Sequence, residues 1–334
     1  MYKFALVGCG NISSRHVENI NRVGKLTAVC DIIPEKADLL AAKFAAKPYY
    51  RIDDLLRIES DTEVIVVCTP NGLHAEHSIK SLHAGKHVLC EKPMCLTTPD
   101  ALKMIEAEKS SNKILFVVKS ARFNPLLNQL KKAIEGNVLG KIYSVQLNCF
   151  WHRPVDYYKD WHGKIFSDGG TLYTQFSHYI DSLLWIIGEI KDLNGYRKNV
   201  AHKSSIEFED TGVVCFDNIN GIIGTINWSV NTYRKNAEIG LTILAEKATI
   251  SLGGEYLNEV KYVLSDAFSL SPIINPLPNE YTNYRGSMSH HREIYNSVIE
   301  TLQNPGNEVG NSTDGLKTVK TIEKIYSTVP LTDD

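Results

Sequence analysis

Residues 2–120 alternate between short apolar runs and helix-like segments, and this alternation constrains the fold more than any other feature of the sequence. The apolar runs of strand length are "KFALVG", "LTAVCD", "EVIVVCTP", "HVLCEKP" and "ILFVVKS". Unbroken Val, Ile and Leu runs suit strands that are buried on both faces, and strands interleaved with helices indicate right-handed crossovers in a parallel sheet. The sequence therefore predicts a doubly wound α/β unit in this region.

The pattern changes after about residue 121. A helix and the long strand "KIYSVQLNCFW" are followed by the runs "TGVVCFD", "GIIGTINWSV", "IGLTILA" and "KATISL". This order predicts a large, mostly antiparallel open sheet with helices on one face. Because 334 residues exceed what one hydrophobic core usually serves, we expect two domains, residues 1–121 and 122–334, of the α/β and α+β types.

The stretch "ALVGCGNISSRHVENI" joins the first predicted strand to a helix through Gly-x-Gly. In a dinucleotide site the first glycine permits the tight turn, the second lets the backbone approach a pyrophosphate, and the third position must be small, as Ser13 is. Asp31 ends the second strand, where a carboxylate accepts hydrogen bonds from a ribose and repels a 2′-phosphate. The alternative is a tight connection that holds no ligand. We expect NAD to contact Gly8, Gly10, Asn11, Ile12 and Asp31.

The composition argues against several other classes of protein. A formal net charge of −2 provides no basic field for nucleic acid or anionic lipid, so we expect neither as a partner. The seven cysteines are scattered without CxxC spacing, which argues against disulfides and zinc and favours the cytoplasm. We expect no metal site, no membrane span and no signal peptide, because the apolar run after Lys3 is short and leads into the glycine turn.

Three further stretches carry a family resemblance. "TPNGLHAEH" at 69–77, "EKP" at 91–93 and "ARFNP" at 121–125 resemble the glucose-fructose oxidoreductase, inositol dehydrogenase and rhizopine-catabolism (Gfo/Idh/MocA) superfamily. The resemblance implies an N-terminal Rossmann domain and a substrate domain whose sheet pairs with another subunit, hence a homo-dimer or homo-tetramer. An apolar stripe in "GIIGTINWSV" is expected to supply that contact. The NAD-site residues that the resemblance adds are Thr69, Asn71, His74, Glu91 and Lys92.

Residues 151–181 look most like the UDP-N-acetylglucosaminuronate 3-dehydrogenases of bacterial surface-polysaccharide (lipopolysaccharide O-antigen) synthesis. Many members of the superfamily carry Asp four residues before a helical histidine, whereas this chain has Thr174 before His178. That departure agrees with the nucleotide-sugar subgroup. The resemblance therefore implies a UDP-sugar substrate.

Oxidation of a secondary alcohol needs a proton acceptor for the hydroxyl while a hydride leaves for the nicotinamide. His178 is the expected base, because an imidazole with a reference pKa of about 6.5 is largely neutral at pH 7, whereas a lysine with a pKa of about 10.4 is not. Lys92 is expected to hydrogen-bond the reacting hydroxyl and to stabilise the developing alkoxide. Lys92 as the base, or a proton relay between the two, stays open. Asp181 either orients His178 or is a surface carboxylate.

Substrate contacts are expected from three regions. The loop 152–167 combines cations for phosphate with aromatic faces for a base or a sugar. A helix from about Gly170 places Thr174 and His178 on one face, with Gln175 beside them. Residues 121–125 follow the domain junction. The expected substrate ligands are Lys92, Arg122, Asn124, Arg153, Tyr157, Trp161, Thr174, Gln175 and His178.

The leading hypothesis is a NAD-dependent dehydrogenase that oxidises the C3 hydroxyl of UDP-N-acetylglucosaminuronate to a 3-keto sugar. One alternative is oxidation of a free sugar or an inositol on the same scaffold, and another is a dinucleotide-binding regulator without catalysis. The sequence also leaves open whether NADH is released or is recycled in place by a 2-oxo acid.

Overall fold

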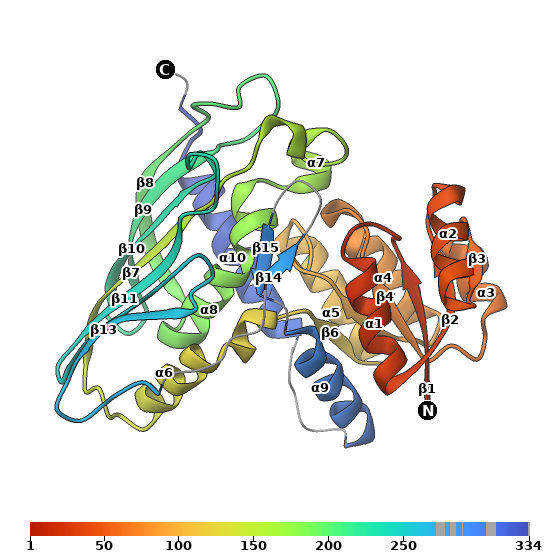
Figure 1. The fold of residues 1–334 in the computed structure, drawn as a ribbon, viewed down its shortest axis with the longest axis horizontal. Helices are drawn as coiled ribbons and strands as arrows, with labels where there is room; N and C mark the ends of the chain where they lie inside the picture. Colours follow the sequence, from red (N-terminus) through yellow and green to blue (C-terminus); the bar gives the residue numbers. More distant parts are fainter. Residues whose placement is uncertain (272–277, 281–284, 289, 305–311, 333–334) are drawn as a thin grey trace. The chain divides into compact units, whose positions relative to one another are not determined.

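The computed structural model describes residues 1–271, 278–280, 285–288, 290–304 and 312–332 (Figure 1). The chain divides into two compact units, the first formed by residues 1–119 and 291–319 and the second by residues 120–290 and 320–334. The sequence instead predicts one boundary after residue 121, with the whole remainder in the second domain. The two divisions differ because a late helix of the chain returns to the first unit.

The first unit is built on a six-stranded parallel sheet in the order β3-β2-β1-β4-β5-β6. Its strands are β1 Tyr2–Val7, β2 Gly24–Cys30, β3 Lys47–Tyr49, β4 Val64–Val67, β5 His87–Cys90 and β6 Leu115–Val117. All four residues of β4 are buried, as expected for a central strand covered on both faces. This strand order is that of a Rossmann fold, so the predicted parallel sheet is confirmed.

The helices of the first unit include one that is distant in sequence. Thr97 caps α5 by accepting the Asp100 N–H at 3.2 Å, with a proline in the first turn. The late helix α9 packs against α1, which is why residues 291–319 belong to this unit. The helices are α1 Ser13–Val23, α2 Pro34–Phe44, α3 Ile52–Ile58, α4 His74–His83, α5 Thr98–Ser111 and α9 His291–Gln303, with the short turn η1 Asn71–Leu73.

The second unit contains a seven-stranded sheet in the order β13-β12-β11-β7-β10-β9-β8. Its strands are β7 Ile142–Phe150, β8 Ile190–Lys198, β9 Thr211–Asn218, β10 Ile223–Ser229, β11 Glu238–Ala245, β12 Ala248–Gly253 and β13 Glu259–Leu264. β7 and β10 run parallel and the other neighbours run antiparallel, so the predicted mostly antiparallel sheet is confirmed. The strands β14 Pro278–Glu280 and β15 Arg285–Met288 pair in a separate ribbon.

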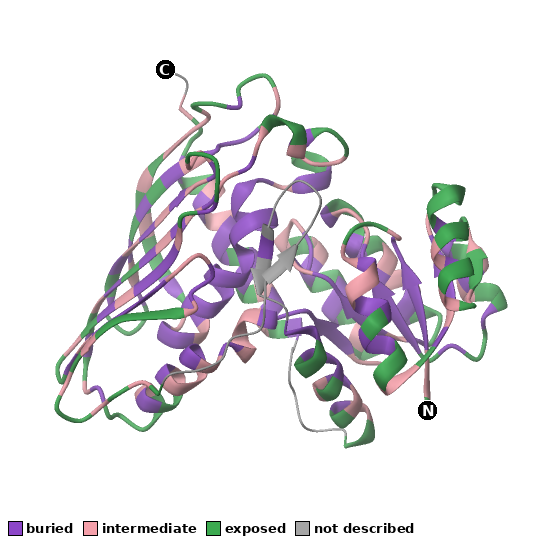
Figure 2. Ribbon diagram, viewed as in Figure 1, coloured by how far each residue is buried: buried purple, intermediate pink, exposed green. Residues whose placement is uncertain are grey.

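Burial alternates along β9 and β10, as expected for a sheet with one covered face (Figure 2). In β10 the side chains of Ile226 and Trp228 are buried, whereas Ile223 is 61% exposed. The sequence analysis expects an apolar stripe of this segment on the open face, and this is wrong for Ile226 and Trp228. The two-residue period turns both into the core and leaves Thr225 and Asn227 on the open face.

Helices cover the other face of this sheet. α8 packs on β7, and α6 packs on α8. α8 is buried along nearly its whole length (Figure 2). The helices and short turns are α6 Pro125–Glu135, α7 Ile165–Asp168 and α8 Ser177–Ile187, with η2 Ser120–Phe123, η3 Val155–Tyr158 and η4 Leu172–Phe176. The last helix, α10 Ser312–Thr328, begins in the first unit and ends in the second.

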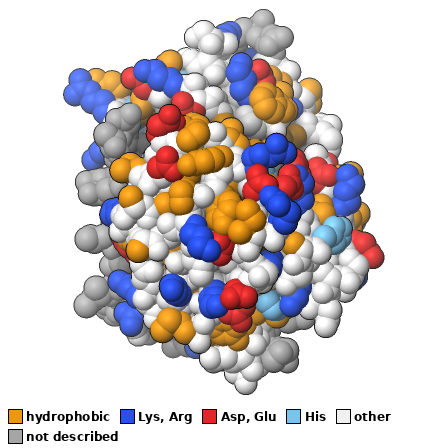
Figure 3. All heavy atoms as spheres, turned by 90° about the vertical axis from the view of Figure 1, so that its right-hand side faces the viewer, with side chains coloured by type: hydrophobic (Ala, Val, Ile, Leu, Met, Phe, Trp, Pro, Cys, Tyr) orange, Lys and Arg blue, Asp and Glu red, His pale blue; other side chains and the backbone are white. Residues whose placement is uncertain are grey.

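Acidic and basic side chains are intermixed on the face shown in Figure 3, with small hydrophobic patches between them. Such a surface has no large field of one sign, in keeping with the net charge of −2. Among the helices of the described residues, none combines the length and hydrophobicity that crossing a membrane requires.

Candidate active site

The turn between β1 and α1 is shaped to receive a phosphate. Gly8 has a φ of +98°, and a Cβ there would lie 2.5 Å from Cys68 O, so glycine is required. A Cβ on Gly10 would meet no described atom beyond its neighbours within 4 Å, so the backbone is open where a ligand would approach. The Ser13 hydroxyl donates to Gly10 O at 2.6 Å and closes the turn. The turn therefore fits a pyrophosphate at the N-terminus of α1, flanked by Asn11 and Ile12.

Asp31 follows β2 and is tied to the same turn. Its Oδ2 accepts the Cys9 N–H at 2.8 Å, and its Oδ1 accepts the Ile33 N–H at 2.9 Å. These two bonds fix the direction of the carboxylate, and each oxygen keeps a lone pair for a ribose hydroxyl. The position fits the role that the sequence predicts for Asp31.

Thr69 follows β4, Asn71 begins η1 and His74 begins α4. The side chain of Asn71 is buried in η1. The ring of His74 lies between two carbonyl oxygens, with Nδ1 2.6 Å from Pro93 O and Nε2 2.8 Å from Thr69 O. Both carbonyl oxygens only accept, so each ring nitrogen is placed to donate; these two hydrogen bonds oppose the effect of burial, which lowers the pKa of His74. Because both ring nitrogens face backbone, we withdraw His74 as a direct NAD ligand and regard it as the link between the loops after β4 and β5.

Glu91 is the centre of a buried hydrogen-bond network in the first unit. Its Oε1 lies 2.8 Å from His16 Nε2 and 3.4 Å from His291 Nε2, and its Oε2 accepts the Lys92 N–H at 3.0 Å. Tyr295 extends the network, with its hydroxyl 2.9 Å from His16 Nδ1. Since a carboxylate only accepts, His16 donates through Nε2 and accepts from Tyr295 through Nδ1. The backbone of Lys92 is thereby joined to α1 and α9.

The protonation states of this network follow from its surroundings. Burial alone would raise the pKa of Glu91, but the hydrogen bonds from His16 and His291 hold it well below its ordinary value. Burial lowers the pKa of His16, which outweighs the opposing effect of Glu91. An ionised Glu91 and a neutral His16 agree with both pKa shifts. They also agree with the hydrogen bonds that His16 makes to Glu91 and Tyr295.

The same three residues also have the composition of a metal site. Ligand atoms of His16, Glu91 and His291 all lie within 4.8 Å of one another. The 2.8 Å separation of His16 Nε2 and Glu91 Oε1 is a hydrogen-bond distance, and the other carboxylate oxygen is engaged by Lys92. We therefore interpret the cluster as a hydrogen-bond network that positions Lys92.

In the second unit, His178 lies in the first turn of α8 and is buried. Its Nε2 is 3.4 Å from the hydroxyl oxygen of Ser120. The preceding turn, η4, is π-helical, whereas the sequence predicts one continuous α-helix from about Gly170. Because a π-turn contains an extra residue, a spacing of four residues does not place Thr174 and His178 on one face as it would in a continuous α-helix. Thr174 instead donates from its hydroxyl to the backbone and carboxylate oxygens of Asp168.

Arg122 and Asp181 form a bidentate ion pair. Arg122 Nε lies 2.7 Å from Asp181 Oδ2, and Nη2 lies 3.0 Å from Oδ1. The sequence analysis expects Arg122 at the substrate and leaves Asp181 as either an orienting or a surface carboxylate. The structure instead pairs the two, and it buries Asp181 rather than leaving it on the surface. We therefore withdraw Arg122 as a substrate ligand.

Arg153, Gln175 and Tyr157, three of the expected substrate ligands, contact one another. Arg153 is buried, and its Nε donates to Gln175 Oε1 at 2.6 Å. Gln175 Nε2 in turn donates to the Tyr157 hydroxyl at 2.8 Å. The guanidinium also lies over the rings of Trp151 and Tyr157, at 4.8 and 5.4 Å from their centroids. This arrangement fixes a cation and an aromatic face beside η4.

The other two predicted substrate ligands, Asn124 and Trp161, differ in whether their side chains are engaged by the fold. Asn124 caps α6 through the Leu126 N–H at 2.9 Å, and its amide donates to Leu257 O at 2.8 Å. Because both ends of this buried amide serve the fold, we withdraw it as a substrate ligand. Trp161 is partly exposed and stacks on His162 with ring centroids 3.9 Å apart. It stays a proposed substrate ligand.

Sequence reasoning misses the partners of Glu91. None of His16, His291 and Tyr295 is given a role from the sequence. The only available signal is that each histidine precedes or lies within an amphipathic helix, and helical periodicity does not identify which distant side chain a residue meets.

The first unit is a Rossmann fold with an open glycine turn and an acidic residue after β2. The second unit has an open sheet and a buried helical histidine. Together these features define a two-domain NAD-binding oxidoreductase. Residues 2–119 match the model described as "Oxidoreductase family, NAD-binding Rossmann fold", and residues 127–251 match the "GFO/IDH/MocA C-terminal domain". The chain belongs to the Gfo/Idh/MocA family, its cofactor is NAD, and the predicted family and cofactor are confirmed.

Two solved structures resemble this chain over almost its whole length. The WlbA dehydrogenase from Chromobacterium violaceum, in complex with NADH and UDP-GlcNAcA, is 33% identical with a TM-score of 0.88, covering 98% of this chain and 93% of that one. The WlbA dehydrogenase from Bordetella pertussis, with the same ligands, is 33% identical with a TM-score of 0.86, covering 100% and 99%.

A curated relative is more distant. The D-glucoside 3-dehydrogenase of Escherichia coli K12 is 26% identical over 233 residues, which are 68% of this chain and 66% of that enzyme. The chain thus spans about two thirds of the length of that relative.

Proposed function

We propose that this NAD-dependent sugar dehydrogenase oxidises the C3 hydroxyl of UDP-N-acetylglucosaminuronate to a 3-keto sugar, for bacterial surface-polysaccharide (O-antigen) synthesis. The observation that carries the proposal is the 33% identity, over 98–100% of the chain, to two dehydrogenases crystallised with NADH and UDP-GlcNAcA. The glycine turn and Asp31 supply the cofactor side of the reaction.

The proposed chemistry is a hydride transfer coupled to loss of a proton. NAD supplies the acceptor for the hydride that leaves the sugar C3. His178 takes the hydroxyl proton as the C=O bond forms, and Lys92 donates a hydrogen bond to the oxygen on which negative charge develops. The products are the ketone, NADH and one proton. Near-normal turnover in a His178 variant would assign the proton acceptor to Lys92, whereas a relay requires both groups.

The substrate has anionic and aromatic parts that match side chains of the second unit. The Arg153 guanidinium is buried and held by Gln175, Asn236 and two aromatic rings, so we propose it as a support whose positive charge favours a diphosphate or a carboxylate nearby. The Trp161–His162 stack is partly exposed and offers an aromatic surface for a uracil or a sugar ring. We propose Arg153, Tyr157, Trp161, Thr174 and Gln175 as substrate ligands or supports.

The test is formation of NADH, followed by absorbance, when the protein is mixed with NAD and UDP-N-acetylglucosaminuronate. Parallel reactions use a methyl D-glucoside and myo-inositol, and each is repeated with added 2-oxoglutarate. Turnover of the nucleotide sugar alone supports the proposal, and a burst that becomes sustained only with 2-oxoglutarate supports recycling of bound NADH. Turnover of the glucoside or inositol with none of the nucleotide sugar would assign the chain to the free-sugar alternative, for which the E. coli relative is the supporting observation.

Retained NAD binding without turnover of any of these alcohols would favour the regulator alternative. A matched control is UDP without the sugar, which competes with the nucleotide sugar only if a uridine site exists. UDP that slows turnover supports the nucleotide-sugar substrate.

We also propose a cytoplasmic homo-oligomer, a dimer or a tetramer. All seven cysteines are free thiols, as a reducing compartment requires. The open face of the seven-stranded sheet carries Ile223 (61% exposed) and Tyr143 (50% exposed) among Thr and Asn side chains, which suits a partly apolar subunit contact. Light scattering at micromolar concentration tests this oligomer, and a mass near that of one chain contradicts it. The variant Tyr143→Asp should weaken the subunit contact.

A further inference from the structure

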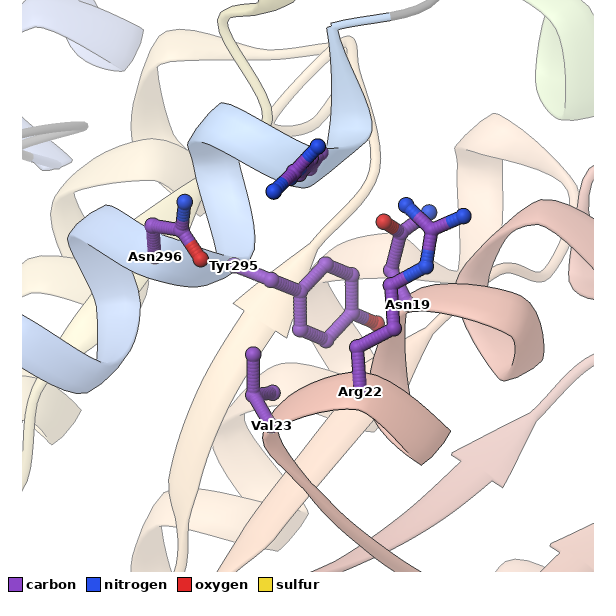
Figure 4. A pocket seen from close by; sticks show the side chains of 6 residues that line it. Asn19, Arg22, Val23, Tyr295 and Asn296 are labelled. Atoms are coloured by element: carbon purple, nitrogen blue, oxygen red, sulfur yellow. The ribbon is translucent and has the colours of Figure 1, made fainter.

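A cavity of about 350 Å³ lies between α1 and α9 in the first unit (Figure 4). Each helix contributes a single face: Asn19, Arg22 and Val23 come from α1, and Arg292, Tyr295 and Asn296 come from α9. The volume is within the range of small-molecule sites. None of the proposed cofactor or substrate ligands lines this cavity.

The charges of this cavity are uncompensated. The lining contains two arginines and no carboxylate. Among the described residues, Arg22 and Arg292 make no hydrogen bond or ion pair, whereas Arg15, on the same helix as Arg22, pairs with Glu18. Arg292 also lies in the first turn of α9, where the helix dipole disfavours a cation. Two unpaired guanidinium groups from different helices are suited to share one anion.

The lining also includes a buried hydrogen-bond acceptor, which sets a second requirement for the ligand of this cavity. Asn19 is 6% exposed, and its amide nitrogen donates to Arg15 O at 2.8 Å. Its Oδ1 is buried and has no hydrogen-bond partner in the described structure. Figure 4 shows Asn19 and Arg22 among the side chains that line the cavity. An unsatisfied buried acceptor favours a ligand that brings a hydroxyl donor.

Tyr295 and Val23 form the apolar part of the lining, and Asn296 adds a second amide. The Tyr295 ring crosses the centre of the view in Figure 4, with Val23 beside it. The hydroxyl of Tyr295 already donates to His16, so the ring offers its face rather than its polar end. Aromatic faces with neighbouring amides and arginines are the groups that hold the carbon skeleton, hydroxyls and anion of a phosphorylated sugar.

We propose that the groove between α1 and α9 is a binding site for a small sugar phosphate, separate from the dehydrogenase reaction. Arg22 and Arg292 hold the phosphate, Asn19 and Asn296 bind hydroxyls, and Tyr295 with Val23 contacts the carbon skeleton. The site does not depend on the identity of the sugar that the enzyme oxidises.

The experiment is calorimetric titration of the full chain with D-ribose 5-phosphate while NADH is held at saturation, so that the glycine turn is occupied. Orthophosphate and D-ribose are titrated in parallel. We expect ribose 5-phosphate to bind, and the Arg22→Gln/Arg292→Gln variant to weaken binding by about 100-fold, since each charged hydrogen bond is worth roughly tenfold. Arg15→Gln is the matched control on α1 and should bind as the parent does.

Each other result overturns the proposal. No binding by the parent chain, or equal binding by the double-arginine variant, removes the site. Equal affinity for orthophosphate, together with no loss in Asn19→Ala, shows an anion site without sugar recognition. Both arginines are exposed and pair with no described residue, so the melting temperature of the double variant should match that of the parent, which separates lost binding from lost folding.

Discussion

The Nε2 of His16 lies 2.8 Å from the Oε1 of Glu91, and this bond joins the helix that follows the glycine turn to the residue that precedes Lys92. Glu91 Oε2 receives the backbone N–H of Lys92 at 3.0 Å. One ionised carboxylate thus orients the backbone at Lys92 and is itself held by α1. The geometry predicts that changes to Glu91 act on catalysis through the position of Lys92.

Glu91→Gln should lower both stability and turnover. An amide presents an NH₂ group to either His16 or Lys92, so one buried donor loses its acceptor, which costs about 1–3 kcal/mol of unfolding free energy. Displacement of Lys92 should reduce kcat by roughly 10- to 100-fold. Urea denaturation and steady-state kinetics measure the two effects.

Glu59→Gln is the matched control for that prediction. Glu59 is also a buried carboxylate of the first unit, and it accepts from Lys47 and Tyr49 at 2.8 and 2.6 Å. Its variant should lose stability and keep kcat. An unchanged kcat in Glu91→Gln, or an equal loss in both variants, would contradict a positioning role for Glu91.

His178→Asn should reduce kcat by about 10² to 10⁴ while the Kd for NADH changes little, because the imidazole is proposed to move a proton and not to hold the cofactor. NADH fluorescence titration measures the Kd. Ser120→Ala removes the hydroxyl 3.4 Å from His178 Nε2 and should have a much smaller effect, since it can only orient the ring. Near-normal turnover in His178→Asn, with turnover abolished in Lys92→Met, would make Lys92 the proton acceptor.

The preference for NAD should depend on the charge of Asp31. In the variant Asp31→Ser/Ile32→Arg the carboxylate that repels a 2′-phosphate is gone, and Ile32, which is 84% exposed, is replaced by a cation. We expect NADH to bind about tenfold or more weakly and NADPH binding to appear. Ile32→Arg alone should keep the preference for NADH, and equal preference in both variants would show that Asp31 does not set it.

The Arg122–Asp181 pair should contribute to folding and not to substrate affinity. The side chains are 18% and 8% exposed, so Arg122→Gln or Asp181→Asn leaves a mostly buried partner unpaired, at a cost of roughly 2–4 kcal/mol of unfolding free energy. The double variant should be less destabilised than the sum of the single variants. A coupling free energy near zero, with a raised KM in Arg122→Gln, would instead return Arg122 to the substrate.

Local patterns predict the first unit well and the candidate site only in part. The buried runs around Val64–Val67 and the glycine turn are short-range features, because strand burial and the tight turn are encoded in adjacent residues. β3 (Lys47–Tyr49) has no apolar run and is not predicted, since an edge strand of three residues needs little hydrophobicity.

The network of His16, Glu91 and His291 could not be predicted for a different reason. Its members are far apart in the sequence, and the amphipathic pattern of α9 indicates a buried face without indicating that the face packs on α1. The π-turn at Leu172–Phe176 is invisible to a 3.6-residue period, so the predicted relation between Thr174 and His178 fails there. Pairings such as Arg122–Asp181 depend on the tertiary fold in the same way.

The stability of the second unit should fall between pH 4.5 and 7 because of Glu209. This side chain is fully buried; it accepts from the Tyr326 hydroxyl at 2.8 Å and from Trp228 Nε1 at 3.2 Å, with Arg197 Nη1 3.4 Å from its other oxygen. Burial raises the pKa of Glu209 from its ordinary 4.5 to about 7, against the opposing effects of Tyr326 and Arg197. The folded state therefore binds a proton that the unfolded chain releases.

A raised pKa in the folded state means that the stabilisation is complete below pH 4.5 and is lost as the pH rises through about 7. The loss is on the order of 3 kcal/mol, from about 1.4 kcal/mol per pKa unit. Urea denaturation across this range should give a falling unfolding free energy for the parent chain and a flatter one for Glu209→Gln, which does not titrate. The neighbouring His202–Asp210 pair is present in both proteins, so its contribution cancels in the difference. Parallel pH profiles for the two proteins would show that Glu209 stays ionised, held by Arg197 more strongly than burial opposes it.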